Sequence, residues 1–264
     1  MPSGLKRAPY CGAFLLWICF PTLLSPSPAA ADACVPCGGE WHEVSSVHDG
    51  DTLRLRDGRT VRLIGVNTPE LEPRGVTDAQ PGAEAARLAL ERLVKQSGQR
   101  VRVCAGAQGR DRYRRHLAHL YDSQGESINQ RLLRLGVGYL IAIPPNLKNL
   151  TCYAVAEAAA REAGLGVWRQ PLQDASRLRG DEAGFHLLRG RIIRVGQSRS
   201  GVWLNLDGGL AIRIRWDDWK SFAIEEPDEF LGSLLEVRGW IYRRKGEQRL
   251  AVRHPASIRW LDRE

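Results

Sequence analysis

The chain has 264 residues, of which 26% are charged, and 38 lysine and arginine residues outnumber 30 aspartate and glutamate residues. This excess of positive charge favours a polyanionic partner, although a solvated basic surface would give the same count. The sequence contains neither an internal repeat of short period nor a low-complexity tract, which excludes a repeat protein.

Residues 1–31 have the pattern of a secretory signal peptide. Positive residues precede an apolar run at 13–24, and a stretch of small residues ends at Ala31. The run is shorter than the roughly 20 apolar residues that span a membrane, so we predict cleavage after Ala31. The mature protein would then be secreted or periplasmic, with no stable insertion in a membrane. An uncleaved anchor is the alternative.

Four cysteines remain after that cut, namely Cys34, Cys37, Cys104 and Cys152. An even number of cysteines in an exported chain suggests two disulfides. Three pairings are possible and the spacing does not choose among them. We expect the two cysteines of the N-terminal tail, 32–40, to pair with the other two. A zinc site with all four thiolates and lipid attachment at Cys34 are the less favoured alternatives.

Residues 41–169 form the first predicted globular segment. Alternating residues at 53–56, the turn signal Asp57-Gly58 and the run 60–66 predict a β-hairpin. Apolar spacing and capping residues predict three helices, at 81–94, 127–135 and 153–163, with strands at 100–104 and 117–121. Strands followed by helices indicate a small barrel flanked by helices.

Residues 170–184 resemble a linker, and residues 185–264 form a second, mainly β segment. Five short β-rich runs occur at 192–193, 203–206, 212–214, 237–242 and 250–252. One helix is expected after the third run, near 219–223 or 227–232. This order predicts an OB-type barrel, although the edge of a β-sandwich would give a similar pattern.

Two polar clusters flank the predicted hairpin. Asp49 and Asp51 surround a glycine, and Asn67, Thr68 and Glu70 follow the return strand. Pairing across the hairpin would bring Asp51 opposite Asn67 and Glu70, where several oxygen atoms could bind a hard cation such as Ca²⁺. The alternative is that Asp-Gly merely forms a turn.

Two arginines extend this candidate site. Arg62 lies within a strand among apolar neighbours, where an unpaired charge would be costly. Arg115 comes just before another predicted strand. Two guanidinium groups can bind the oxygens of a phosphodiester and neutralise the charge that develops during its cleavage. A solvated basic face is the alternative for the arginine-rich stretch that contains Arg115.

Three ordered blocks resemble the signature motifs of the staphylococcal nuclease (thermonuclease) family. They are Asp49-Gly50-Asp51-Thr52, Val61-Arg62-Leu63-Ile64-Gly65-Val66-Asn67-Thr68-Pro69-Glu70 and Asp111-Arg112-Tyr113-Arg114-Arg115-His116-Leu117-Ala118. The resemblance covers essentially all of 41–169. It implies a mainly β fold with α-helices, in which an OB-fold nuclease domain precedes a second, smaller OB-like barrel. That second segment is similar to small OB-type domains that follow nuclease domains in exported bacterial proteins.

The resemblance also implies an activity, a cofactor and residue roles. The activity would be Ca²⁺-dependent hydrolysis of phosphodiester bonds in DNA and/or RNA, as a phosphodiesterase/endonuclease that leaves 3′-phosphate ends. No obligate protein partner is implied. The implied residues are Asp51, Asn67 and Thr68 for the metal, Glu70 for the attacking water, Arg62 and Arg115 for the phosphate, and Arg112, Tyr113 and Arg114 for the nucleic acid.

The sequence departs from the family pattern at several positions. Asn67 stands where a second metal-binding aspartate is usual, so we expect weaker Ca²⁺ affinity. Arg114 replaces the usual glycine, so the turn before Arg115 is expected to differ. The stretch 139–146 lacks the tyrosine pair that flanks the nucleotide, which leaves base preference open. Competing hypotheses are a catalytically weak tandem-OB nucleic-acid-binding protein and an envelope protein that binds protein partners.

Overall fold

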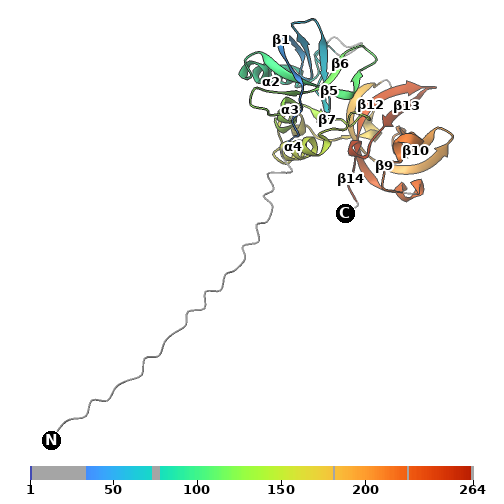
Figure 1. Cartoon of the computed structure of the whole chain (residues 1–264). Helices are drawn as coiled ribbons and strands as arrows, with labels where there is room; N and C mark the ends of the chain where they lie inside the picture. The colour runs from blue at the N-terminus through green and yellow to red at the C-terminus, as the bar shows by residue number, and fades with distance from the viewer. Residues whose placement is uncertain (2–33, 73–77, 181, 225, 263–264) are drawn as a thin grey trace.

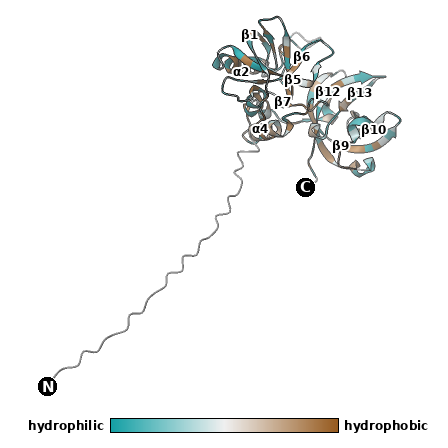
Figure 2. Cartoon of the chain, in the orientation of Figure 1, coloured by the Kyte–Doolittle hydropathy of each residue, from teal (hydrophilic) through white to brown (hydrophobic). Residues whose placement is uncertain are grey.

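The computed structural model describes residues 1, 34–72, 78–180, 182–224 and 226–262, and it contains two β-barrels with helices (Figure 1). The predicted fold class, mainly β with α, is therefore confirmed. The predicted signal peptide lies outside the described residues apart from Met1. Buried hydrophobic residues fill the core of each barrel, and Figure 2 shows hydrophobic and hydrophilic residues interspersed along the strands.

The first barrel closes in the order β1-β2-β3-β6-β5. Its strands are β1 (Glu40–Asp49), β2 (Thr52–Leu55), β3 (Thr60–Leu63), β5 (Arg100–Arg110) and β6 (His116–Tyr121). The hairpin β2–β3 is the one predicted from Asp57-Gly58, and Gly58 takes the left-handed conformation that this turn requires. The parallel pairing of β3 with β6 sets Arg62 opposite Leu117.

Helices and one short sheet cover this barrel. They are α2 (Ala83–Gln96), α3 (Ile128–Arg134) and α4 (Leu150–Glu162), with β4 (Val66–Asn67) paired to β7 (Tyr139–Leu140). Helix α3 begins as predicted, because the Ser127 side chain accepts a hydrogen bond from the Gln130 backbone N–H at 3.2 Å. Helix α2 packs Leu90 and Leu93 into the core that the barrel strands enclose.

The second barrel repeats the strand order of the first, as β9-β10-β11-β13-β12, and closes where β12 pairs with β9. The strands are β9 (Gly184–Ser198), β10 (Gly201–Leu206), β11 (Ala211–Ile214), β12 (Leu234–Arg244) and β13 (Glu247–Val252). Two further strands, β14 (Ile258–Trp260) and β8 (Gln173–Asp174), extend the sheet.

The short helical elements are η1 (Gly166–Arg169), η2 (Ala175–Arg177), α5 (Trp216–Trp219), η3 (Pro227–Phe230) and η4 (Pro255–Ser257). Strand β8 and helix η2 fall inside the predicted linker and pack on this barrel, where Ala175 is fully buried in the core.

Two disulfides tie the N-terminal tail to the first barrel and its helices. Cys34 is bonded to Cys152 in α4, and Cys37 is bonded to Cys104 in β5. The sulfur of Cys34 is thus held in a disulfide, which argues against lipid attachment there. Stable disulfides are typical of proteins that fold outside the reducing cytoplasm. None of the helices within the described residues combines the length and the hydropathy needed to cross a membrane.

Candidate active site

The turn between β1 and β2 places Asp51 at the mouth of the first barrel, where its side chain is almost fully buried. Gly50 allows this turn to pack closely against its surroundings. A Cβ atom at Gly50 would lie 2.9 Å from the Thr68 side chain and would overlap the side chain of Ala86 in α2. The glycine therefore brings Asp51 next to the segment that follows β4.

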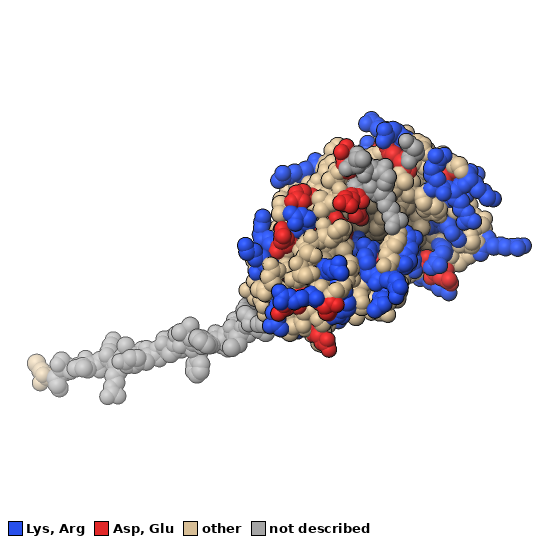
Figure 3. Space-filling model, turned by 90° about the horizontal axis from the view of Figure 1, so that it is seen from above, with Lys and Arg blue, Asp and Glu red and all other residues tan. Residues whose placement is uncertain are grey.

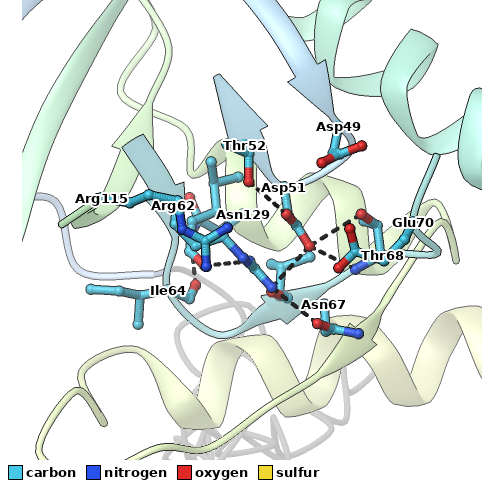
Figure 4. A network of polar contacts seen from close by, with 12 residues as sticks. Asp49, Asp51, Thr52, Arg62, Ile64, Asn67, Thr68, Glu70, Arg115 and Asn129 are labelled. Atoms are coloured by element: carbon cyan, nitrogen blue, oxygen red, sulfur yellow. Dashed lines mark hydrogen bonds and ion pairs between the residues drawn. The ribbon is translucent and has the colours of Figure 1, made fainter. Parts of the chain in front are cut away.

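Three hydrogen bonds and one ion pair fix the Asp51 carboxylate (Figure 4). The backbone N–H and hydroxyl of Thr68 donate to Oδ2 at 2.9 and 3.1 Å, and the hydroxyl of Thr52 donates to Oδ1 at 3.0 Å. Nη2 of Arg62 lies 2.9 Å from Oδ2. Charge-assisted contacts of this kind hold a buried carboxylate in one orientation. The contacts of Thr68 come from its N–H and hydroxyl, so the expected role of its carbonyl in metal binding stays a prediction.

Arg62 links the two predicted polar clusters. Its Nη2 also donates to Oδ1 of Asn67 at 3.0 Å, and its Nη1 donates to the backbone oxygens of Leu63 and Val66 at 3.0 and 2.6 Å. Arg62 thus donates three hydrogen bonds in addition to its ion pair with Asp51. The charge of Arg62 is therefore compensated although its side chain is buried. Arg62 bridges the oxygens of Asp51 and Asn67.

Glu70 lies at the open edge of the same mouth (Figure 4). Its backbone N–H donates a hydrogen bond to Oε1 of Gln80 at 2.8 Å, which holds the backbone of Glu70 in place. Desolvation, with the negative charges of Asp51 and Asp49, raises the pKa of Glu70, and Arg62 and Arg115 oppose this rise. Figure 4 shows the side chains of all five residues in one region of the barrel mouth.

Asp49 is a member of this group that the sequence motif contained but that we had not assigned to the site. Its side chain is buried, and desolvation is the main cause that raises its pKa, followed by the opposing effect of His48 and the repulsion from Asp51. The spacing Asp-Gly-Asp was the available signal, because two acids around a tight turn can both face inward.

Arg115 follows the turn between β5 and β6. Its Nε donates to Asp111 Oδ2 at 2.7 Å, and its guanidinium lies 5.4 Å from the ring centre of Tyr113. Arg114 has φ 67°, in the left-handed region that glycine favours, so the turn keeps a glycine-like backbone despite the substitution. A cleft of ≈ 250 Å³ beside Arg115 is lined by Tyr113 and Arg114, but its lining does not include Arg112.

The donor set of the mouth consists of oxygen atoms, which fits a hard divalent cation. Asp49, Asp51 and Glu70 supply carboxylates. Desolvation raises the pKa of Glu70 and repulsion from Asp51 and Asp49 adds to the rise; a cation would relieve that repulsion. Within the described part of the chain, however, no three His, Cys, Asp or Glu side chains are grouped tightly enough to hold a metal ion by themselves. The amide oxygen of Asn67 would have to complete such a site.

The first domain is thus a closed OB-type barrel whose mouth holds carboxylate and guanidinium side chains. Residues 60–170 match the family described as "Staphylococcal nuclease homologue", so the chain carries a domain of that family. The matched residues include Arg62, Asn67, Glu70 and Arg115, whereas Asp51 precedes them.

Two characterised proteins are similar to this chain. The "Succinoglycan biosynthesis protein ExoI" of Rhizobium meliloti is 35% identical over 130 residues, which is 47% of this chain and 63% of that protein. The "Endonuclease YhcR" of Bacillus subtilis is 27% identical over 233 residues, which is 83% of this chain and 17% of that protein. The chain thus spans less than two thirds of each relative. The second alignment is longer than either barrel and so includes parts of both.

Proposed function

We propose that this protein is an exported nuclease that hydrolyses phosphodiester bonds of DNA and/or RNA and uses Ca²⁺. The observation that carries the proposal is that Asp51 and Glu70 lie with Arg62 and Arg115 at one barrel mouth (Figure 4). The endonuclease relative and the family match support the same reaction class. The two disulfides support a secreted or periplasmic location.

Each group in the mouth has a role that its surroundings favour. Glu70 is exposed to solvent and would accept a proton from the attacking water. Arg115 has its Nε bound to Asp111, so its two terminal nitrogens are oriented to bind phosphate oxygens. Asp51, Asn67 and Thr68 would hold Ca²⁺, which supplies Lewis-acid polarisation of the phosphate when bound. Cleavage would leave 3′-phosphate ends.

The direct test is digestion of single-stranded DNA and of RNA by the purified mature protein. We expect cleavage with Ca²⁺ and loss of cleavage when a chelator is added, and end-labelling should detect 3′-phosphates. Equal amounts of product with Ca²⁺ and with chelator would reject Ca²⁺ as the cofactor. Absence of cleavage of both substrates under both conditions would reject the nuclease proposal.

Asn67 provides a test of the metal ligands. We expect Asn67→Asp to tighten Ca²⁺ binding on the order of tenfold, because a carboxylate adds a negative charge to the oxygen ligands. Isothermal titration calorimetry measures this change. Asn205→Asp adds the same charge in β10 of the second barrel and should leave the affinity unchanged. Tight Ca²⁺ binding that Asn67→Asp does not alter would contradict the expectation of a weakened site.

Binding of nucleic acid without cleavage is a second candidate function, and one feature of the second barrel favours it. Trp203 in β10 lies near two guanidinium groups, with Arg249 at 4.8 Å and Arg213 at 5.7 Å from its ring centre. It lines a cleft of ≈ 240 Å³ together with Arg194 and Asn205. Aromatic rings among arginines are typical of surfaces that bind single strands. Basic side chains are also frequent on the face shown in Figure 3.

We expect Trp203→Ala to weaken binding of a single-stranded oligonucleotide by about 5- to 100-fold, because stacking contributes about 1–3 kcal/mol per base. Fluorescence anisotropy with chelator present measures affinity without cleavage. Leu231→Ala, which removes an exposed apolar side chain outside this cleft, serves as the matched control. Equal affinities of the Trp203 variant and the wild type would exclude this cleft as a binding surface.

A further inference from the structure

A buried ion pair joins the two barrels. Arg238 in β12 of the second barrel places Nη1 at 2.6 and 2.7 Å from the two carboxylate oxygens of Glu157 in α4. The side chains of both residues are less than a tenth exposed. A buried pair of this kind often contributes little net stability, because desolvation offsets the attraction. Its presence at the junction is therefore not explained by stability alone.

Both charged groups hold the peptide groups of one residue, Leu140 in β7. Glu157 Oε1 accepts a hydrogen bond from the Leu140 N–H at 2.6 Å, and Arg238 Nη1 donates to the Leu140 carbonyl at 3.2 Å. Leu140 is itself 3% exposed, so water cannot replace these partners at low cost. The position of β7 thus depends on a side chain from the second barrel.

Strand β7 in turn supports the candidate active site. It pairs with β4, with Leu140 opposite Val66 and Tyr139 opposite Asn67. The carbonyl of Val66 and the side chain of Asn67 are two of the acceptors that fix Arg62. A continuous series of contacts therefore runs from Arg238 through β7 and β4 to the guanidinium that bridges Asp51 and Asn67.

The surroundings of the pair keep Arg238 in place. The rings of Tyr139, Phe185 and Trp240 follow one another across the junction, with 5.3 and 5.2 Å between ring centres. Glu236, next to Arg238 on the same face of β12, pairs with Arg161 in α4 and with Arg259. These contacts dock β12 against α4 and β7, as Figure 1 shows for the adjoining parts of the two barrels.

We propose that Arg238 is a positioning residue for the nuclease site, so that the second barrel completes the geometry of the first. The inference rests on the proposed nuclease function. Displacement of reacting groups by about 1 Å can lower a rate about 100-fold. Loss of the Arg238 contacts would therefore reduce turnover even though Arg238 touches neither substrate nor cation.

The test uses three variants of the full chain: Arg238→Met, Glu157→Gln/Arg238→Met and Arg259→Met. The double variant avoids a buried unpaired carboxylate, so it remains measurable if Arg238→Met fails to fold. Arg259→Met removes an equal charge from the same junction without touching β7. Assays run well below the melting temperature of each variant. We expect kcat to fall 10- to 100-fold in both Arg238 variants, KM to change less than twofold, and Arg259→Met to match the wild type.

Amide hydrogen exchange supplies a readout that does not need activity. Exchange in peptides covering 62–70 should rise at least tenfold in the double variant and not in Arg259→Met. Wild-type kcat in a folded double variant, with unchanged exchange at 62–70, would overturn the positioning role. If the wild type itself cleaves nothing, the proposed function fails, whereas the exchange data still decide whether Arg238 holds this segment.

Discussion

Glu70→Gln should lower kcat for cleavage of single-stranded DNA by about 100- to 10,000-fold, the range that positioned general bases contribute. The amide has nearly the same shape as the carboxylate but cannot accept the proton of the attacking water. Glu70 is exposed and contacts the chain through its backbone, so the substitution should change the melting temperature little. Initial rates in Ca²⁺ and a thermal melt measure the two effects.

Glu72→Gln is the matched control, because Glu72 is an exposed carboxylate in the same loop and has no place in the proposed site. Binding of the oligonucleotide, measured with chelator present, should be retained in the Glu70 variant. Equal cleavage rates in Glu70→Gln and the wild type would reject Glu70 as the base, and with it the present assignment of the site. Equal losses in both glutamate variants would instead indicate a general effect of charge in this loop.

Removal of the Cys34–Cys152 disulfide should cost about 2–5 kcal/mol of the free energy of unfolding. The bond joins residues 118 positions apart, so it restricts the unfolded chain over the whole length from the tail to α4. It also packs on a core of buried residues that includes Val66 and Leu140. Urea unfolding of Cys34→Ala/Cys152→Ala, compared with the wild type, measures the loss.

The second disulfide provides an internal comparison. Cys37 and Cys104 are 67 positions apart, so loop entropy alone predicts a loss smaller by about 0.5 kcal/mol for Cys37→Ala/Cys104→Ala. Cys34→Ala/Cys152→Ala should also cleave more slowly at temperatures near its melting point. Cys152 and Glu157 both lie in α4, so loosening of this helix would displace the carboxylate that binds Leu140 in β7. A loss below about 1 kcal/mol in the first variant would show that the packing of the tail, and not the bond, holds it in place.

Local sequence patterns predicted those elements whose signals lie within a few residues. The turn signal Asp57-Gly58 correctly predicted the hairpin β2–β3, and the capping hydroxyl of Ser127 correctly predicted the start of α3. Strand β1 was not predicted, and β5 runs to Arg110 where we expected an end at 104. Strand β1 depends on pairing with β5, where Glu40 lies opposite Val103, and the extension of β5 depends on pairing with β6, where Arg110 lies opposite His116. Such pairing has no signal in either segment alone.

The same limit applies to the candidate site. The motif spacing was sufficient to bring Asp51, Arg62 and Glu70 together, because one hairpin connects them. Glu157 and Arg238 are 81 positions apart and belong to different barrels, so their ion pair could not be predicted. At Arg114 the sequence suggested a difference that the structure does not show. Arginine in place of the usual glycine suggested a changed turn, but Arg114 takes a positive φ, as a glycine would.

The parallel pairing of β3 with β6 has a consequence for the order of events during folding. A nascent chain that has emerged only as far as β5 already contains Asp51, Arg62 and Glu70, but it lacks the strand that closes the barrel. Pairing between such distant segments is slow to form. The candidate site should therefore stay incomplete until the chain has been made beyond Tyr121, the last residue of β6, so that a fragment ending at β5 should lack the activity that we propose for the whole chain.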